Sequence, residues 1–193
     1  MYYTGLQLTT MMSRATNFIA VPSEYHIIGV RCADQIPNEF NCTFHLMKGT
    51  DLILSTTGTT VPGTPSLLGG FLKYNKKGSA VVVANYVYNE VWKFGKHGGW
   101  LPALKQLGAK IFVGRDGNKN KEAEDTNNRV WGYFGINFHT ATKNYLGKII
   151  KKYVNNWSHG CQVCNNTVEY MHIINLTRKQ KTVTYTLLDE FSV

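Results

Sequence analysis

Acidic residues, prolines and long apolar runs are all scarce in this chain of 193 residues, which has 12 Asp and Glu against 21 Lys and Arg, and five prolines. No apolar run approaches the roughly 18–20 residues needed to cross a membrane, so no integral membrane segment is expected. The start of the chain lacks the basic and apolar regions of a secretory signal peptide, so none is predicted. A composition of 43% hydrophobic and 17% charged residues excludes a disordered chain.

The charge balance is strongly positive, with a formal net charge of +9. Such an excess favours an anionic partner, which could be nucleic acid, a membrane surface or an anionic cell wall. The lysines form short, scattered clusters, and neither an RNA-recognition signature nor a dense basic arm accompanies them. The pattern therefore favours a cell wall or plain solubility, and no nucleic-acid partner is expected.

Four cysteines leave several interpretations open. Two disulfides are possible, although a chain with no recognisable signal peptide argues against them. A zinc site is also possible, with Cys161 and Cys164 joined by His159 or His139, but a structural zinc site normally has a second closely spaced pair. The simplest interpretation makes Cys164 a small buried apolar residue, and Cys32 and Cys42 likewise. No metal or organic cofactor is expected.

The pattern along the chain is mainly that of β-structure. We expect an N-terminal arm over 1–24, helical or otherwise ordered, followed by one domain over 25–193. Short β-branched or apolar runs predict strands, and the turn at 48–50 predicts a hairpin between two of them. The predicted strands cover 25–32, 40–47, 51–57, 80–88, 90–94, 110–114, 129–139 and 182–188. The expected fold is a β-sandwich or barrel with one or two helices.

Three other segments carry specific expectations. Residues 58–70, rich in Gly and Pro, predict a long loop of the kind that often lines a site. Residues 166–178 have helical spacing, with Asn166 as N-cap and Glu169 completing a capping box. Residues 140–156 are ambiguous between a basic helix and a hairpin arm.

Two segments carry the chemistry. The first, Phe134 to His139, ends an apolar run on a histidine, and the second, Trp157 to Val163, holds a cysteine in a Ser-His-Gly-Cys turn. A thiol needs a base to become a nucleophile, and the oxyanion that it forms needs hydrogen-bond donors. The sequence therefore predicts an enzyme with a cysteine nucleophile. His97, Arg115 and Asp116 fall in predicted turns and could line its cleft, although such residues are more often structural.

A histidine, a spacer and then Ser-His-Gly-Cys resembles the active-site signature of the L,D-transpeptidase catalytic-domain family, and the wider context resembles a branch common in phage genomes. Chain order separates it from papain-like and NlpC-like peptidases, in which the cysteine precedes the histidine. This sequence departs from the family pattern in the Gln162-Val163 that follows the cysteine and in a rather long spacer. The resemblance implies an L,D-transpeptidase-like β-fold over the domain.

The resemblance also implies roles for individual residues. Cys161 would be the nucleophile and His139 the base, forming a thiolate–imidazolium pair. The backbone carbonyl of Thr140 would orient His139. The N–H groups of Gly160 and Cys161 would stabilise the oxyanion, with glycine required so that the backbone can approach substrate. Ser158 and His159 would shape the turn and could hydrogen-bond substrate.

The implied reaction is attack on a peptide carbonyl of the peptidoglycan stem through a thioacyl-enzyme. Resolution by water gives a carboxypeptidase or endopeptidase, and resolution by an amine gives a transpeptidase. The phage-like context favours the hydrolase, acting in cell-wall degradation from the virion or after release from the host cytoplasm. Other virion proteins are then candidate partners. The non-enzymatic alternatives are an inactive wall-binding or virion structural module, and a zinc or nucleic-acid-binding domain.

Overall fold

The structure is a computed structural model that describes residues 3–33, 36 and 38–190. Its regular structure consists mainly of two α-helices and eleven strands. The helices are α1 (Gly5–Ser13) and α2 (Thr167–Thr177), with two short helical segments, η1 (Ser66–Gly70) and η2 (Asn155–Trp157). The strands are β1 (Tyr25–Arg31), β2 (Cys42–Lys48), β3 (Asp51–Thr59), β4 (Ser79–Val82), β5 (Tyr86–His97), β6 (Leu101–Gln106), β7 (Ile111–Asp116), β8 (Val130–Gly132), β9 (Phe138–Thr140), β10 (Gln162–Cys164) and β11 (Val183–Asp189).

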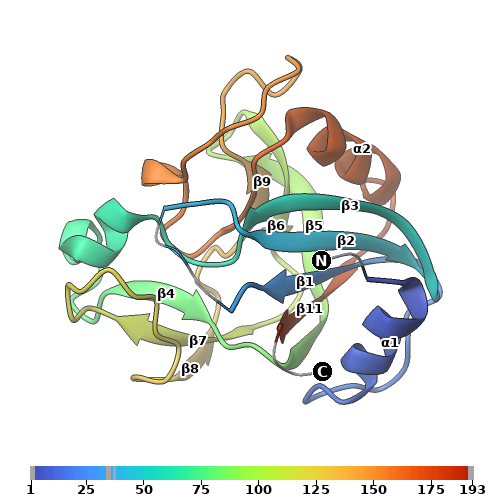
Figure 1. Cartoon of the computed structure of the whole chain (residues 1–193), viewed down its shortest axis with the longest axis horizontal. Helices are drawn as coiled ribbons and strands as arrows, with labels where there is room; N and C mark the ends of the chain where they lie inside the picture. The colour runs from blue at the N-terminus through green and yellow to red at the C-terminus, as the bar shows by residue number, and fades with distance from the viewer. Residues whose placement is uncertain (1–2, 34–35, 37, 191–193) are drawn as a thin grey trace.

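Eight of these strands close into a barrel in the order β1-β11-β5-β6-β9-β10-β3-β2, and β4, β7 and β8 form a separate antiparallel sheet beside it (Figure 1). Most barrel neighbours are antiparallel, but β1 pairs with β11 and β9 pairs with β10 in parallel. The predicted mainly β fold with one or two α-helices is confirmed. The predicted hairpin is also present, as β2 and β3 pair along their whole length.

One hydrophobic core joins the barrel, the small sheet and α2. Trp92 of β5 and Tyr185 of β11 stack inside it with ring centroids 4.4 Å apart. Tyr170, Ile173 and Ile174 of α2 pack into the same cluster. Each fully buried large side chain of this kind contributes about 1.5–3 kcal/mol through the apolar surface that it removes from water. The small sheet is therefore packed onto the barrel as part of one body.

The N-terminal arm is packed against the barrel. A capping box between Thr4 and Gln7 begins α1. Leu8 and Met12 of this helix are fully buried in a second cluster with residues of β1, β2, β5 and β11. Figure 1 shows α1 beside these strands, at the opposite end of the molecule from the small sheet.

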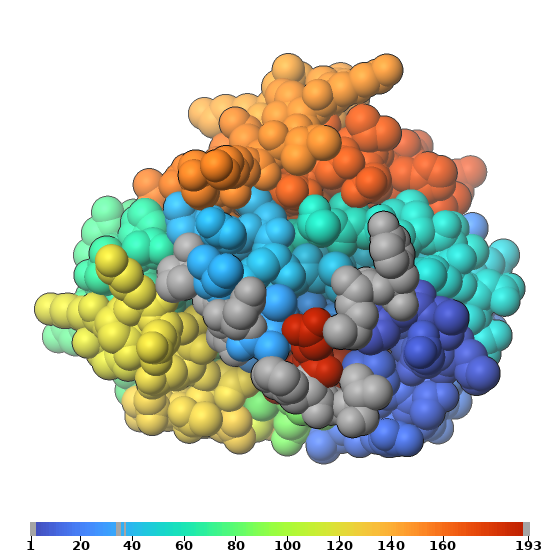
Figure 2. Space-filling view, in the orientation of Figure 1, coloured from blue at the N-terminus to red at the C-terminus, as the bar shows by residue number. Residues whose placement is uncertain are grey.

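The predicted helix at 166–178 is present as α2. Asn166 is its N-cap, as expected. The Asn166 side chain accepts a hydrogen bond from the Val168 N–H at 3.0 Å, however, whereas a capping box needs a hydrogen bond from the Glu169 N–H. In the segment 140–156, by contrast, Thr140 ends β9 and the remaining residues form neither an α-helix nor a hairpin arm. They make a long loop that ends in η2, and Figure 2 shows it as a projection at one end of the molecule, next to α2.

Two segments that were predicted as single strands are each divided into two strands. The run 80–88 is divided between β4 and β5 because Asn85 adopts a left-handed conformation (φ 59°) and redirects the chain. The run 129–139 is divided into β8 and β9, because side chains from the barrel bind the backbone between them. The N–H groups of Phe134 and Ile136 donate to Oε1 of Gln106, and Trp92 Nε1 donates to the Ile136 carbonyl.

Candidate active site

The parallel pairing of β9 with β10 brings the two predicted segments together. His139 lies opposite Val163 in this register, and the Gln162 N–H donates to the Asn137 carbonyl at 2.9 Å. Cys161 stands one residue before β10, so its side chain emerges where the ladder begins. A ring nitrogen of His139 and the Cys161 Sγ lie within 4.8 Å of each other. The predicted nucleophile and base are therefore neighbours.

The His139 side chain is completely buried, and one hydrogen bond orients it. Its Nδ1 lies 2.9 Å from the Thr140 carbonyl oxygen, which can only accept, so Nδ1 carries the hydrogen and Nε2 has a free lone pair. Within the described residues, Nε2 has no hydrogen-bond partner. Desolvation, reinforced by nearby His97, lowers the pKa of His139 to about 3, although the Thr140 bond acts in the opposite direction. The predicted role of the Thr140 carbonyl in orienting the imidazole fits this geometry.

Cys161 is partly exposed. Its thiol donates to the Gly135 carbonyl at 3.5 Å. Desolvation raises the pKa of the thiol to about 11, while a hydrogen bond from the Asn137 backbone N–H partly offsets the rise. With the pKa of the thiol raised and that of His139 lowered, the free protein holds a neutral thiol beside a neutral imidazole. This differs from the expected thiolate–imidazolium pair, because burial without a compensating carboxylate disfavours both charges.

Ser158 holds the turn that carries the nucleophile. Its buried Oγ donates to the Cys161 carbonyl at 2.9 Å and accepts from the Gly160 N–H at 3.2 Å. Both hydrogen bonds lie within the turn, and this geometry fits the predicted role of Ser158 in shaping it. The Gly160 N–H, however, is already bonded to Ser158 Oγ in the free protein, whereas the resemblance implied a donor available to the oxyanion. The Cys161 N–H remains a candidate.

Gly160 is required for a different reason from the one expected. Its φ is +135°, and a Cβ at this position would lie 2.4 Å from the Ala80 carbonyl oxygen. The glycine thus permits close approach to the backbone of β4 within the protein, which is a structural need independent of substrate.

His159 is tied into the 58–70 loop. Its Nδ1 forms a 2.9 Å hydrogen bond with Ser66 Oγ, which in turn bonds Ser79 Oγ at 2.7 Å. Its ring stacks on Phe71 with centroids 5.1 Å apart. The loop that sequence analysis expected near the site is therefore anchored to the nucleophile turn through His159.

A further residue, Asn137, organises both parts of the site. Its backbone N–H donates to the Cys161 thiol, and its side-chain Nδ2 donates to His97 Nδ1 at 3.0 Å. Its Oδ1 accepts from the Gln106 N–H at 2.9 Å. Sequence reasoning missed the roles of Asn137 and Gln106. Asn137 stands inside the motif segment, whereas Gln106 lies about 30 residues upstream with no local signal.

Of the three weaker candidates, His97 alone contacts the predicted base. Its ring stacks on that of His139 with centroids 4.2 Å apart and an interplanar angle of 21°. Arg115 is buried, and its guanidinium lies over the Phe134 ring at 4.6 Å. Asp116 accepts from the Glu124 N–H at 3.0 Å and shapes the loop after β7.

Among the described residues, the donor atoms of His97, His139 and Cys161 come closest to a metal-binding arrangement, all lying within 4.8 Å of one another. A metal lies in the plane of each imidazole that binds it, and two nearly parallel stacked rings do not direct lone pairs at one point. Of the zinc ligands considered from the sequence, Cys161 and His139 lie together, but Cys164 and His159 do not join them. Cys164 is a thiol buried in the core, and His159 is engaged by Ser66. Cys42 is also buried, as expected, whereas Cys32 is only partly buried, so the expectation for Cys32 was wrong.

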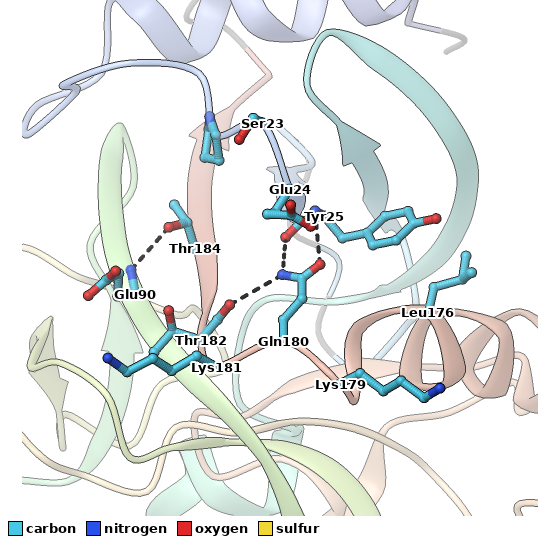
Figure 3. A pocket seen from close by; sticks show the side chains of 11 residues that line it. Ser23, Glu24, Tyr25, Glu90, Leu176, Lys179, Gln180, Lys181, Thr182 and Thr184 are labelled. Atoms are coloured by element: carbon cyan, nitrogen blue, oxygen red, sulfur yellow. Dashed lines mark hydrogen bonds between the residues drawn. The ribbon is translucent and has the colours of Figure 1, made fainter.

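The cavity drawn in Figure 3 is separate from this cluster. It has a volume of about 630 Å³ and lies beside β1, β5, β11 and the end of α2. Gln180 closes one side of it through hydrogen bonds to both backbone groups of Tyr25 and to the Thr182 carbonyl. No cysteine or histidine is among the described residues that line it. The chemistry therefore concentrates at Cys161.

Comparisons of the chain with protein-family models, curated proteins and solved structures found no match. The resemblance to L,D-transpeptidases consequently depends on the motif residues alone. A search of the described residues also found no helix long and apolar enough to cross a membrane.

Proposed function

We propose that this protein is a cysteine-nucleophile hydrolase of peptidoglycan stem peptides, of the L,D-carboxypeptidase or endopeptidase type. The observation that carries the proposal is the Cys161–His139 pair, with the imidazole oriented by the Thr140 carbonyl so that its Nε2 is free to accept a proton. The peptidoglycan substrate is supported by the Ser-His-Gly-Cys motif and the upstream histidine. The formal net charge of +9 suits an anionic wall.

Acylation begins with the thiol turning from the Gly135 carbonyl towards His139. Nε2 removes the thiol proton as Sγ attacks the peptide carbonyl carbon, so the charged pair forms only during the reaction. The resulting oxyanion accepts a hydrogen bond from the Cys161 N–H. The imidazolium then protonates the departing amine, the carbon–nitrogen bond breaks, and an acyl thioester remains on Cys161.

Deacylation uses His139 a second time. It removes a proton from water, hydroxide attacks the thioester, and the thiol is restored with release of the carboxylic acid. An amine in place of water gives transpeptidation. The phage-type context of the motif supports water as the acceptor, in a wall-degrading enzyme carried by a virion or released at lysis.

Mass spectrometry of purified muropeptides tests this proposal. Wild-type protein should remove terminal D-alanine or split cross-links, and Cys161→Ser should do neither. Cys164→Ala is the matched control, because it removes a thiol three residues away that packs in the core. Products with new cross-links or exchanged amino acids would make the protein a transpeptidase. Unchanged muropeptides from several wall types would contradict the enzymatic proposal and favour a binding or structural role.

A further inference from the structure

The oxyanion site lacks one of its expected donors. A tetrahedral intermediate normally receives two or more hydrogen bonds, and loss of one typically costs 10²–10³-fold in kcat. The motif implies two donors, the N–H groups of Gly160 and Cys161. Because the Gly160 N–H donates to Ser158 Oγ, the Cys161 N–H is the one still available. A second donor must therefore come from another part of the fold.

His97 stands at the end of β5 beside the reacting groups. A ring nitrogen of His97 lies within 4.8 Å of both the Cys161 Sγ and a ring nitrogen of His139. Donors to an oxyanion lie about 2.7–3.1 Å from it. Since the oxyanion is itself two bonds from the sulfur, a nitrogen within 4.8 Å of Sγ can reach it. His97 is also only partly buried, unlike His139.

The two histidines are held in opposite tautomers. Asn137 Nδ2 can only donate, so His97 Nδ1 accepts and the hydrogen stays on Nε2. In His139 the Thr140 carbonyl keeps the hydrogen on Nδ1 and leaves Nε2 as an acceptor. The Asn137 amide cannot easily reverse, because its Oδ1 accepts from the Gln106 N–H. One imidazole is thus set as a base and the other as a donor.

We propose that the Nε2–H of His97 donates to the oxyanion of the tetrahedral intermediate and replaces the Gly160 N–H in that role. The proposal rests on the acyl-transfer function given above. Desolvation and the nearby Lys105 lower the pKa of His97, so the ring is neutral near pH 7 and does not repel the His139 imidazolium that forms beside it.

Two substitutions separate hydrogen-bond donation from ring stacking. His97→Gln keeps an amide N–H near the position of Nε2 but removes the ring, and His97→Phe keeps a ring on His139 but removes the donor. We expect His97→Phe to lower kcat about 10²–10³-fold, and His97→Gln to retain most of the activity. Alkylation of Cys161 by iodoacetamide forms no oxyanion, so its rate should be similar in both variants and in wild type.

Two substrates distinguish the possible failures. Muropeptide turnover measures the proposed function, and the nitrophenolate burst from 4-nitrophenyl acetate measures acylation of Cys161 by any ester. A burst reduced in His97→Phe but not in His97→Gln supports the donor role even if muropeptides are not cleaved. Equal bursts and turnover in wild type and His97→Phe would overturn it while leaving the proposed function intact. Full activity in His97→Phe with loss in His97→Gln would show that stacking matters and would also overturn the donor role.

Discussion

Replacing Gly160 by alanine should move the nucleophile without touching it. The new Cβ would lie 2.4 Å from the Ala80 carbonyl oxygen, whereas real Cβ contacts essentially never fall below 3.0 Å. The turn and β4 must therefore separate by at least 0.6 Å, the difference between these distances. Because Cys161 is the next residue, the displacement reaches Sγ directly. A misplacement of about 1 Å can cost roughly 10²-fold in rate.

The same substitution should also lower stability. A φ of +135° belongs to a region that only glycine adopts readily, and such strain costs about 1–3 kcal/mol. For a domain of this size, 1 kcal/mol shifts Tm by roughly 2–4 °C, so we expect a decrease of about 2–12 °C. Scanning calorimetry measures the stability, and the muropeptide assay at a temperature well below Tm measures the rate.

Gly49→Ala is the matched control for Gly160→Ala. Gly49 also has a positive φ, +58°, but a Cβ there would meet nothing within 4 Å, and the residue lies in the β2–β3 turn. We expect a small loss of stability and unchanged activity. Wild-type activity and Tm in Gly160→Ala would refute the close packing of the nucleophile turn against β4.

Three other predictions concern the nucleophile turn, the thiol and two buried histidines. Ser158→Ala leaves the buried Gly160 N–H without its partner, and it should cost about 1–3 kcal/mol in chemical denaturation, whereas exposed Ser23→Ala should cost almost nothing. Desolvation raises the pKa of the Cys161 thiol to about 11, so the rate of its alkylation by iodoacetamide should increase with pH up to about that value. A rate that is already constant at neutral pH would show that the thiol is a thiolate there. Burial lowers the pKa of His45 to about 4 and that of His139 to about 3, so below pH 6.5 the unfolded chain binds protons that the native protein does not. Stability should fall by about 1.4 kcal/mol per pH unit for each histidine as pH drops from 6.5 towards 4, and a Tm independent of pH in that range would contradict this.

Local sequence patterns predicted the elements whose neighbours along the chain are also their neighbours in space. The β2–β3 hairpin and α2 are of this kind, since a turn at Gly49 and an N-cap at Asn166 are local signals. β6 was not predicted, because Pro102, Lys105 and Gln106 make Leu101–Gln106 look unlike a strand. Pro102 is tolerated because the pairing of β6 with β9 is confined to Leu104 and Phe138.

The candidate site was only partly predictable for a similar reason. Cys161 and His139 were found because their motif is short and continuous. The partners that set their environment come from distant segments, with His97 lying 40 residues from the Asn137 that binds it. The bonding of the Gly160 N–H to Ser158 depends on the path of the turn, which residue types alone do not determine.

Intact-protein mass spectrometry during turnover tests the central claim most directly. After rapid acid quenching of a reaction with a tetrapeptide muropeptide, the protein mass should increase by that of the acyl fragment. Peptide mapping should place the adduct on Cys161, and hydroxylamine should release it as expected of a thioester. The adduct should be absent in Cys161→Ala and strongly reduced in His139→Gln. Cleavage of muropeptides with no adduct, or an adduct on another residue, would contradict a Cys161 thioacyl-enzyme.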